Sequence, residues 1–427
     1  MHRLARLAYT TLFFLLLPLI FFRLWRKGAH LPAYRERWAE RLGKISKRDS
    51  DRPAIWFHTV SVGEFIAAIP LIRHYINSQQ YDVIITTMTP TGSDRVHDTF
   101  SNEITHIYLP YDLPFSVNRF LNATRPNILV CLETELWPNL INLCCKRDIP
   151  VVLANARMSE KSARGYRRFS ALTYSMLNTL SLAAVQNHVD AERLIKLGLQ
   201  RECTKIIGNI KFDLSISEQV IASAHKLKAQ LSENGKFKVF IAASTHQGED
   251  EPVLRAFSKV RASDENVKLM IVPRHPERFA SVFTLCEQTG LRCARRSDNT
   301  SAENIDILLC DTMGELLMLY GAADMAFVGG SLIDNGGHNY IEPAAWALPI
   351  ISGPSTINFR EIASELQAEG ALRIINDSEQ LARELLALIT DPAQAIKAGN
   401  AGKQVAEKNK GALEKLIALI DAQLEAN

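Results

Sequence analysis

The sequence predicts an α/β protein built from two parallel sheets, each covered by helices on both faces. Short apolar runs rich in β-branched residues alternate with segments of helical periodicity, which is typical of parallel strands buried on both sides. The length of 427 residues exceeds what one hydrophobic core accommodates, since single cores stop growing at about 250 to 300 residues. Two sheets in two domains are therefore expected.

The apolar runs fall into two series. The first comprises residues 54–60, 82–87, 127–133, 150–155, 182–186 and 204–208, and the second comprises 237–243, 268–273, 305–310, 325–329 and 349–352. A polar stretch between Asp213 and Lys236 separates the series, so we expect the domain boundary there. Near the end of the chain, five apolar residues at helical spacing predict a helix with one buried stripe: Leu413, Leu416, Ile417, Ile420 and Leu424.

The composition excludes several classes of protein. A hydrophobic share of 47% rules out a disordered chain, and a formal net charge of +3 argues against a general nucleic-acid binder. The charge is uneven, because residues 1–48 hold eleven Lys and Arg against two Asp and Glu, whereas the rest of the chain is net acidic. Seven Cys without a C-x-x-C pair indicate buried thiols in a reducing compartment, not disulfides or a zinc site.

The N-terminus carries an uncharged apolar stretch at residues 7–22. Its sixteen residues are just short of the roughly 17 to 25 that cross a bilayer. The heavier basic flank follows the stretch, which predicts a cytoplasmic location for the rest of the chain, and the cleavage site for a signal peptide is poor. A tilted signal-anchor and a deeply inserted interfacial helix both fit, and a buried core helix is the plainer alternative. The basic segment 31–48 predicts a second helix, either solvated or facing lipid headgroups.

Loops after the strands are the candidate functional segments, because ligands of open parallel sheets bind beyond the carboxyl ends of the strands. Glu64 follows the first run and is expected near a helix N-terminus, where it either complements the helix dipole or takes part in chemistry. Glu133 directly follows an apolar strand, where an unpaired carboxylate is costly. Lys211 is its candidate partner, in an ion pair that is either structural or part of a cleft. The hydroxyl-rich segment 86–93 is expected to cap a helix or to bind an anion.

The second half offers two candidate phosphate sites. Arg274 and His275 supply donors suited to a phosphate, and Pro276 suits the first position of the next helix. Two Gly pairs, at 329–330 and 336–337, precede an Asn and a Glu and resemble a nucleotide cradle, with backbone amides for phosphate and a carboxylate for ribose hydroxyls.

Other motifs are weaker or missing. Thr312 and Glu315 fit a capping box at the start of a helix. The chain contains no phosphate-binding P-loop, no G-x-G-x-x-G and no H-E-x-x-H, and its one D-x-D, at Asp49 and Asp51, precedes a strand. Nothing in the sequence therefore requires a metal.

Nine segments, in order along nearly the whole chain, resemble those of bacterial 3-deoxy-D-manno-octulosonic acid (Kdo) transferases of lipopolysaccharide assembly. They are SVGE (61–64), TTMTPTGS (86–93), YLPYDLP (108–114), ETELWPN (133–139), NARMS (155–159), PRHPERF (273–279), DTMGEL (311–316), FVGGS (327–331) and GGHNYIEPA (336–344). The resemblance implies a GT-B fold, with two Rossmann-like domains facing a cleft. Its parts would be an N-terminal membrane anchor at 1–28, an acceptor-binding domain at 29–215, a CMP-sugar-binding domain at 216–403 and a helix at 404–427 that packs back toward the first domain.

The same resemblance implies an activity. Kdo would pass from CMP-Kdo to the lipid A precursor (lipid IVA), with inversion and release of CMP, on the cytoplasmic face of the bacterial inner membrane. No metal and no nucleic acid would take part. Glu64 would be the general base, and Glu133 and Lys211 would stabilise the transition state. CMP would be held by Arg274, His275, Met313, Gly314, Glu315, Asn339, Tyr340, Ile341 and Glu342. The Tyr340–Ile341 pair departs from the family pattern, in which a smaller residue often stands there.

Two other interpretations remain open at this point. One is a GT-B transferase that uses another nucleotide sugar, such as a UDP sugar, on a membrane acceptor. The other is a membrane-tethered nucleotide-sugar-binding protein without catalysis, which leaves the Glu64 loop unexplained. Binding of CMP in preference to UDP would distinguish a Kdo transferase from the first alternative. Transfer of the sugar to an acceptor would distinguish it from the second.

Overall fold

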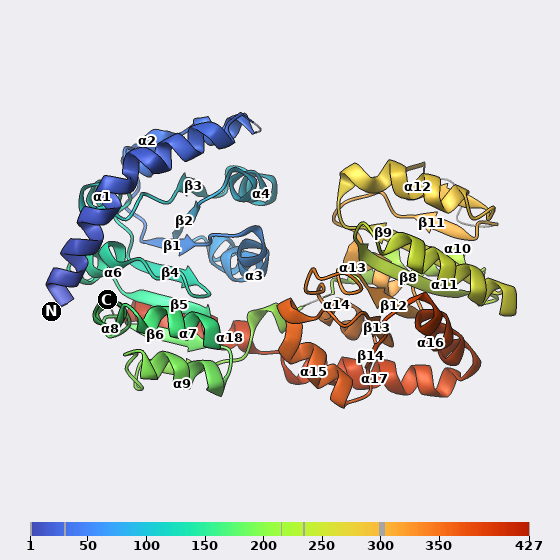
Figure 1. Cartoon of the computed structure of the whole chain (residues 1–427). Helices are drawn as coiled ribbons and strands as arrows, with labels where there is room; N and C mark the ends of the chain where they lie inside the picture. Colours follow the sequence, from blue (N-terminus) through green and yellow to red (C-terminus); the bar gives the residue numbers. More distant parts are fainter. Residues whose placement is uncertain (1, 30, 215, 234, 299–303, 427) are drawn as a thin grey trace. The chain divides into compact units, whose positions relative to one another are not determined.

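The computed structural model describes residues 2–29, 31–214, 216–233, 235–298 and 304–426, which form two compact units (Figure 1). The first unit comprises residues 1–213 and 410–427, and the second comprises 214–409. Each unit contains one seven-stranded sheet in which all strand pairs are parallel. The α/β prediction with two parallel sheets is confirmed.

The first sheet has the strand order β3-β2-β1-β4-β5-β6-β7. Its strands are β1 (Ala54–His58), β2 (Asp82–Thr87), β3 (Thr105–Tyr108), β4 (Ile128–Leu132), β5 (Val151–Ala156), β6 (Leu182–Val185) and β7 (Thr204–Ile206). Both faces are buried, because Trp56 contributes to the core on one side while Ile55 and Phe57 contribute to the core on the other.

Helices cover both faces of this sheet, and Figure 1 shows α3 and α4 on the face opposite α6. The helices of the unit are α1 (His2–Lys27), α2 (Trp38–Arg41), α3 (Val62–Ser78), α4 (Pro90–Phe100), α5 (Pro114–Thr124), α6 (Pro138–Cys145), α7 (Glu160–Arg167), α8 (Ser170–Leu177), α9 (His188–Lys196) and α18 (Ala412–Glu425), with 3-10 turns η1 (Pro32–Arg35) and η2 (Ile210–Phe212). The hydroxyl-rich segment caps α4 as predicted, since the Thr89 side chain accepts a hydrogen bond from the Gly92 N–H at 3.2 Å.

The second sheet has the order β10-β11-β9-β8-β12-β13-β14. Its strands are β8 (Lys238–Thr245), β9 (Val267–Pro273), β10 (Cys293–Arg295), β11 (Ile307–Leu309), β12 (Met325–Val328), β13 (Ile350–Ser352) and β14 (Leu372–Ile374). Its helices are α10 (Glu218–Ser232), α11 (Asp250–Ser263), α12 (Phe279–Glu287), α13 (Leu316–Gly321), α14 (Ile341–Ala345), α15 (Arg360–Ala368), α16 (Ser378–Thr390) and α17 (Pro392–Lys408), with 3-10 turns η3 (Pro276–Arg278), η4 (Arg296–Asp298) and η5 (Ile357–Phe359).

Three strands were missing from the predicted series, and each lies at the edge of a sheet: β3, β10 and β14. An edge strand is covered less completely, so its sequence needs no continuous apolar run. All three residues of β10 are only partly buried, and β14 buries Leu372 alone.

The C-terminal segment differs from the predicted helix at 404–427. Residues 404–408 end α17, which belongs to the second unit, and only α18 belongs to the first. The predicted stripe is correct, because Leu416 and Ile420 are fully buried in the first unit. Asp213 accepts hydrogen bonds from the N–H groups of Gly411 and Leu413 at the start of α18, which fixes the return of the chain.

The basic segment 31–48 is not a continuous helix, contrary to both alternatives considered above. Several of its arginines face the protein. Arg37 pairs with Glu40 at 2.7 Å, and buried Arg41 lies over the Tyr108 ring at 4.3 Å. Arg48 pairs with Asp82 at 2.6 Å. These contacts bind the segment to the edge of the first sheet, so part of the N-terminal positive charge is neutralised within the unit.

Helix α1 lies against the first unit along much of its length. Arg6 donates to the Asn142 side chain, and the Asn139 amide donates to the Thr10 hydroxyl at 2.9 Å. Further along, the Phe21 ring lies 5.0 Å from Trp38. The helix is long and apolar enough to cross a membrane, and its other face is exposed: Leu4, Leu7, Leu12, Phe14, Leu15, Leu16, Leu19 and Phe22. The core-helix alternative is therefore wrong.

The predicted burial of the cysteines is confirmed only in part. All seven are free thiols, and Cys131, Cys144, Cys286 and Cys310 are buried. Cys145 is exposed, against the prediction, because it stands at the last position of α6 on the side away from the core.

Candidate active site

The loop after β1 places Glu64 in the first turn of α3. Ser61 is the N-cap residue, and its hydroxyl accepts a hydrogen bond from the Glu64 N–H at 3.2 Å. In return, the two carboxylate oxygens of Glu64 accept hydrogen bonds from the Val60 N–H and the Ser61 hydroxyl, each at 2.8 Å. Burial raises the pKa of Glu64, these hydrogen bonds oppose the rise, and the charge of Glu133 adds to it.

The predicted partnership between Glu133 and Lys211 is present. Glu133 directly follows β4, which pairs with β1, and its backbone adopts a left-handed conformation with φ of 54°. The Lys211 Nζ donates to Glu133 Oε1 at 2.8 Å from η2. Both side chains remain partly exposed, so the pair contributes little to stability, about 0 to 1 kcal/mol. The pair lies close enough to Glu64 for the charge of Glu133 to act on that carboxyl group.

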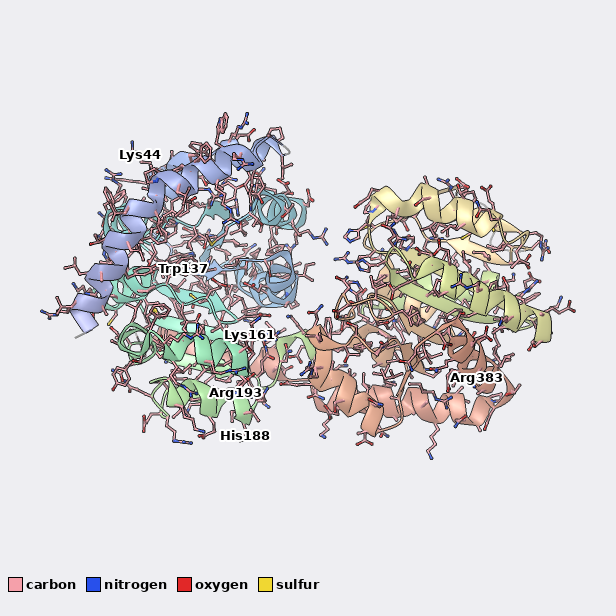
Figure 2. The ribbon with its side chains drawn as sticks, viewed as in Figure 1. Lys44, Trp137, Lys161, His188, Arg193 and Arg383 are labelled. Carbon is pink, nitrogen blue, oxygen red and sulfur yellow. The ribbon has the colours of Figure 1, made fainter. Side chains whose placement is uncertain are left out.

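A third carboxylate, Glu135, joins this site and had no role in the sequence-based prediction. Burial and then the charge of Glu64 raise the pKa of Glu135 to about 7. The next aromatic residue, Trp137, packs against the core of the unit and is labelled in Figure 2. Glu64, Glu133 and Glu135 thus lie close enough for their charges to interact, and Lys211 pairs with Glu133. The segment 133–139 contained the signal, but a carboxylate among apolar residues does not reveal which charges it will meet.

In the second unit, Arg274 and His275 follow β9. Pro276 opens η3, as predicted. The neighbouring Arg278 donates to the Thr245 carbonyl at 2.8 Å and pairs with Asp250. Among the described residues, Arg274 is exposed and has no carboxylate partner, and its positive charge lowers the pKa of Glu342 and of two nearby histidines. Arg278 is therefore structural, whereas Arg274 is available for an anion.

The loop after β12 places Asn339 and Glu342 near Arg274. The Asn339 side chain accepts from the Ile341 N–H and donates to Glu342 Oε1, both at 3.0 Å. Burial raises the pKa of Glu342, while the Asn339 hydrogen bond and the charge of Arg274 oppose the rise. Tyr340 and Ile341, also assigned to CMP by the resemblance, have buried side chains. The Tyr340 hydroxyl bonds the buried Ser352 hydroxyl at 2.8 Å and both side chains are buried, so only their backbone remains for a ligand.

The turn at Met313, Gly314 and Glu315 follows β11, the neighbour of β9 in the sheet. Gly314 has a φ of 85°, and Met313 is exposed. Glu315 pairs with Arg296 at 3.2 Å and accepts from the Thr312 hydroxyl. The capping box is wrong, because α13 begins only at Leu316 and Thr312 bonds a carboxylate, not a backbone N–H. In the described part of the chain, no hydrogen bond or ion pair joins this turn to Arg274 or Glu342.

The first glycine pair, Gly329–Gly330, does not form the phosphate cradle considered from the sequence. The fully buried carboxylate of Glu249 fills that position and accepts from the N–H groups of Gly330 at 2.7 Å, Ser331 at 3.0 Å and Leu332 at 2.9 Å. It also accepts from the His246 N–H at 2.9 Å. The Glu249 carboxylate thus occupies the position at which these backbone amides would bind an anion. Within the described ranges, no group of three or more His, Cys, Asp or Glu is arranged to hold a metal ion.

Comparison with known proteins places this architecture in a class. A glycosyltransferase structure from Rickettsia africae matches 88% of this chain and all of its own, with a TM-score of 0.57 and 14% identity, a likeness of fold. Two parallel-sheet α/β domains of this kind resemble the GT-B fold. The 3-deoxy-D-manno-octulosonic acid transferase of Haemophilus influenzae is 41% identical over 99% of both chains. That of Bordetella pertussis is 31% identical over 94% of this chain and 95% of its own.

A family model described as 3-deoxy-D-manno-octulosonic-acid transferase also matches residues 36–214. The chain belongs to the 3-deoxy-D-manno-octulosonic acid transferase family, and it is a glycosyltransferase that transfers Kdo. The family assignment made from the nine sequence segments is confirmed.

Proposed function

We propose that this enzyme transfers Kdo from CMP-Kdo to the lipid A precursor lipid IVA, with inversion, and that it releases CMP. The observation that carries the proposal is the Glu64 carboxylate. Two hydrogen bonds orient it at the carboxyl edge of the first sheet, and its raised pKa makes it a stronger base than an ordinary glutamate. Family membership supplies the sugar that is moved, and the acceptor and donor are our inference.

In the proposed reaction, Glu64 removes the proton of an acceptor hydroxyl. The resulting oxygen nucleophile forms a bond to the anomeric carbon of Kdo, while the bond from that carbon to the phosphate oxygen breaks and its electron pair leaves with CMP. Positive charge develops on the anomeric carbon in such a transition state. Glu133 offers compensating negative charge, and Lys211 pairs with that carboxylate at 2.8 Å.

We assign CMP to the second unit. Arg274 and His275 neutralise the phosphate, Asn339 and Glu342 bind hydroxyl groups, and the turn at 313–315 bounds the site. Tyr340 and Ile341 contribute backbone groups alone, since their side chains are buried. The leaving group has a single phosphate, so an arginine and N–H donors suffice to stabilise it and no metal is required.

Mass spectrometry of lipid IVA after incubation with enzyme and a CMP-Kdo supply tests the proposal directly. We expect the acceptor mass to rise by whole Kdo units. Calorimetric titration should give binding of CMP and much weaker binding of UDP. An unmodified acceptor in the presence of active donor, or equal affinity for the two nucleotides, would contradict the proposed substrates.

A Glu135→Gln variant should change the pH dependence of turnover. In the wild-type enzyme, activity should rise with pH in two steps: the first as Glu64 ionises, and the second near pH 7 as Glu135 ionises and its charge strengthens Glu64 as a base. The variant should keep the first step and lose the second, with activity lower by about two- to fivefold above pH 8. A second step that persists in the variant would assign it to another group. Initial rates across pH measure both steps.

We also propose that α1 anchors the enzyme to the cytoplasmic face of the inner membrane while lying in the interface, not crossing the bilayer. The contacts of α1 with the first unit run from Arg6 to Phe21, so a spanning position would break most of them. The opposite face presents large apolar side chains, with Leu15 exposed by 70% and Leu19 by 61%. Such a face is suited to the boundary between headgroups and acyl chains.

Replacing Leu15 and Leu19 by Glu should weaken binding to vesicles that contain anionic phospholipid by about tenfold or more, because two buried leucines contribute roughly 3 kcal/mol or more to partitioning. Ile396→Glu is the matched control, since Ile396 is equally exposed on α17 of the second unit. Flotation of vesicles measures the binding. A helix that crosses the bilayer would instead resist release of the wild-type protein by an alkaline carbonate wash.

A further inference from the structure

Two histidines from separate loops of the second unit form a directly hydrogen-bonded pair. The Nε2 atoms of His246 and His338 lie 2.8 Å apart. The ring planes differ by only 6°, and the ring centroids are 5.1 Å apart. The centroid separation exceeds the nitrogen separation by about two ring radii, so the rings meet edge to edge in a nearly common plane. This is the geometry of an N–H···N bond, in which a single proton lies between the two nitrogens.

The surrounding backbone accommodates this pair closely. Gly330, at a φ of 67°, leaves room for the His338 ring, since a Cβ there would come within 3.0 Å of the ring atoms Cδ2 and Nε2. The side chain of Asn335 lies 3.1 Å from His246 Nε2. The Glu249 carboxylate fixes the His246 backbone at 2.9 Å. The His pair is therefore held by the same loop that the buried glutamate organises.

The charges around the pair are mostly positive. The His275 ring packs edge-on to His246, with centroids 5.2 Å apart. Burial lowers the pKa of His338, the charges of His246, Arg274 and His275 add to the effect, and together they bring it to about 4. Burial also lowers the pKa of His246; Glu249 opposes this, whereas His275, Arg278 and Arg274 add to it. Both histidines are consequently neutral at pH 7 in the free protein, beside an exposed arginine.

We propose that the His246–His338 pair is an anion subsite of the donor site that takes up one proton when the negatively charged part of the donor binds beside Arg274. The inference rests on the proposed function, because it takes a CMP-linked sugar acid as the ligand. The shared proton stays in the N–H···N bond, and the added proton goes to a free Nδ1, which gives the pair one positive charge. The donor carries two oxyanions at the anomeric carbon, the phosphate and the Kdo carboxylate, and either has the required charge.

The pH dependence follows from the direction of the change. An anion favours the protonated pair and raises its pKa, so the extra affinity is greatest below the pKa of the free pair and disappears as pH rises through the pKa of the bound pair. Uptake of one full proton makes affinity rise up to about tenfold for each unit that the pH falls within this range. The other groups that act on His246 are His275, Arg274 and Arg278, and the Glu249 carboxylate is already held by four backbone N–H groups.

Calorimetry in buffers of different ionisation enthalpy counts the protons that binding takes up. Wild-type protein, His338→Asn and His246→Asn would be titrated with CMP, with cytidine and with free Kdo, between pH 6 and 8 in roughly half-unit steps chosen to bracket an ordinary histidine. His225→Asn is the control, because His225 is exposed on α10 of the same unit. Thermal unfolding of each variant verifies that it is folded, and His338→Gln replaces any variant that is not.

We expect proton uptake by the wild type and the control, and its loss in both pair variants. Proton uptake with CMP but not with cytidine would identify the phosphate as the anion that binds the pair. Proton uptake with free Kdo but not with CMP would identify the carboxylate. Uptake that is equal in wild type and pair variants would originate on the ligand or on another group such as His275 and would overturn the inference, as would the absence of uptake with every ligand that binds. Failure of the wild type to bind CMP at all would instead contradict the proposed donor.

Discussion

Glu64→Gln is expected to lower the turnover of Kdo transfer by about two to four orders of magnitude. Glutamine keeps the size of the side chain and one acceptor oxygen but cannot remove a proton from an acceptor hydroxyl. The affinity for CMP should not change, because the groups assigned to CMP belong to the second unit. Rates of CMP release with lipid IVA, together with CMP titration of the same variant, measure both quantities.

The fold should tolerate this substitution. Glu64 contributes to the first turn of α3 by accepting from the Val60 N–H and by its charge near the helix dipole, effects of about 1 kcal/mol each. Glu160→Gln is the matched control, since Glu160 is also an acidic residue in a first helical turn of the same unit but is well exposed. Wild-type turnover in Glu64→Gln would disprove the base assignment, and an equal loss in Glu160→Gln would show that the effect is not chemical.

The sheets could be predicted because their central strands are buried on both faces. The run at 128–132 is an example, because all five of its residues are apolar and buried. The partnership of Glu133 with Lys211, 78 residues apart, could also be anticipated, since a carboxylate directly after a buried strand requires a counter-charge. These predictions depended on the free-energy cost of burying each residue, which can be judged from the residue types alone.

Other features depended on which loops meet in space. Glu249 follows a strand as Glu64 does, but its partners are backbone N–H groups more than 80 residues away, and backbone groups leave no mark on the sequence. The Gly329–Gly330 pair looked suited to a phosphate because glycines permit amides to converge, and the convergence is real, although a carboxylate of the protein occupies it. Tyr340 was assigned to the ligand from its place in a motif, which does not reveal that its side chain is buried and bonded to the Ser352 hydroxyl.

The backbone N–H groups that bind the Glu249 carboxylate predict a second large effect, on the stability of the second unit. Glu249→Ala should destabilise the second unit by about 3 to 6 kcal/mol, because it leaves four backbone N–H groups without their acceptor and at least two of them, those of Gly330 and Ser331, are buried. Glu249→Gln should lose less, since its amide oxygen still accepts. Urea unfolding followed by circular dichroism should give an early transition for the alanine variant.

Glu251→Ala tests whether this loss is specific. Glu251 is two positions along in the first turn of α11 and is exposed, so its removal should cost no more than about 0.5 kcal/mol. The consequence for function follows from the loop that Glu249 holds. The Glu249 carboxylate fixes the His246 backbone, and His246 contacts both His338 and His275. Glu249→Gln weakens the hydrogen bonds to this loop, so it should weaken CMP binding even where the unit remains folded. Unchanged CMP affinity in a destabilised Glu249→Gln would separate the stability of this loop from the donor site and confine Glu249 to the fold.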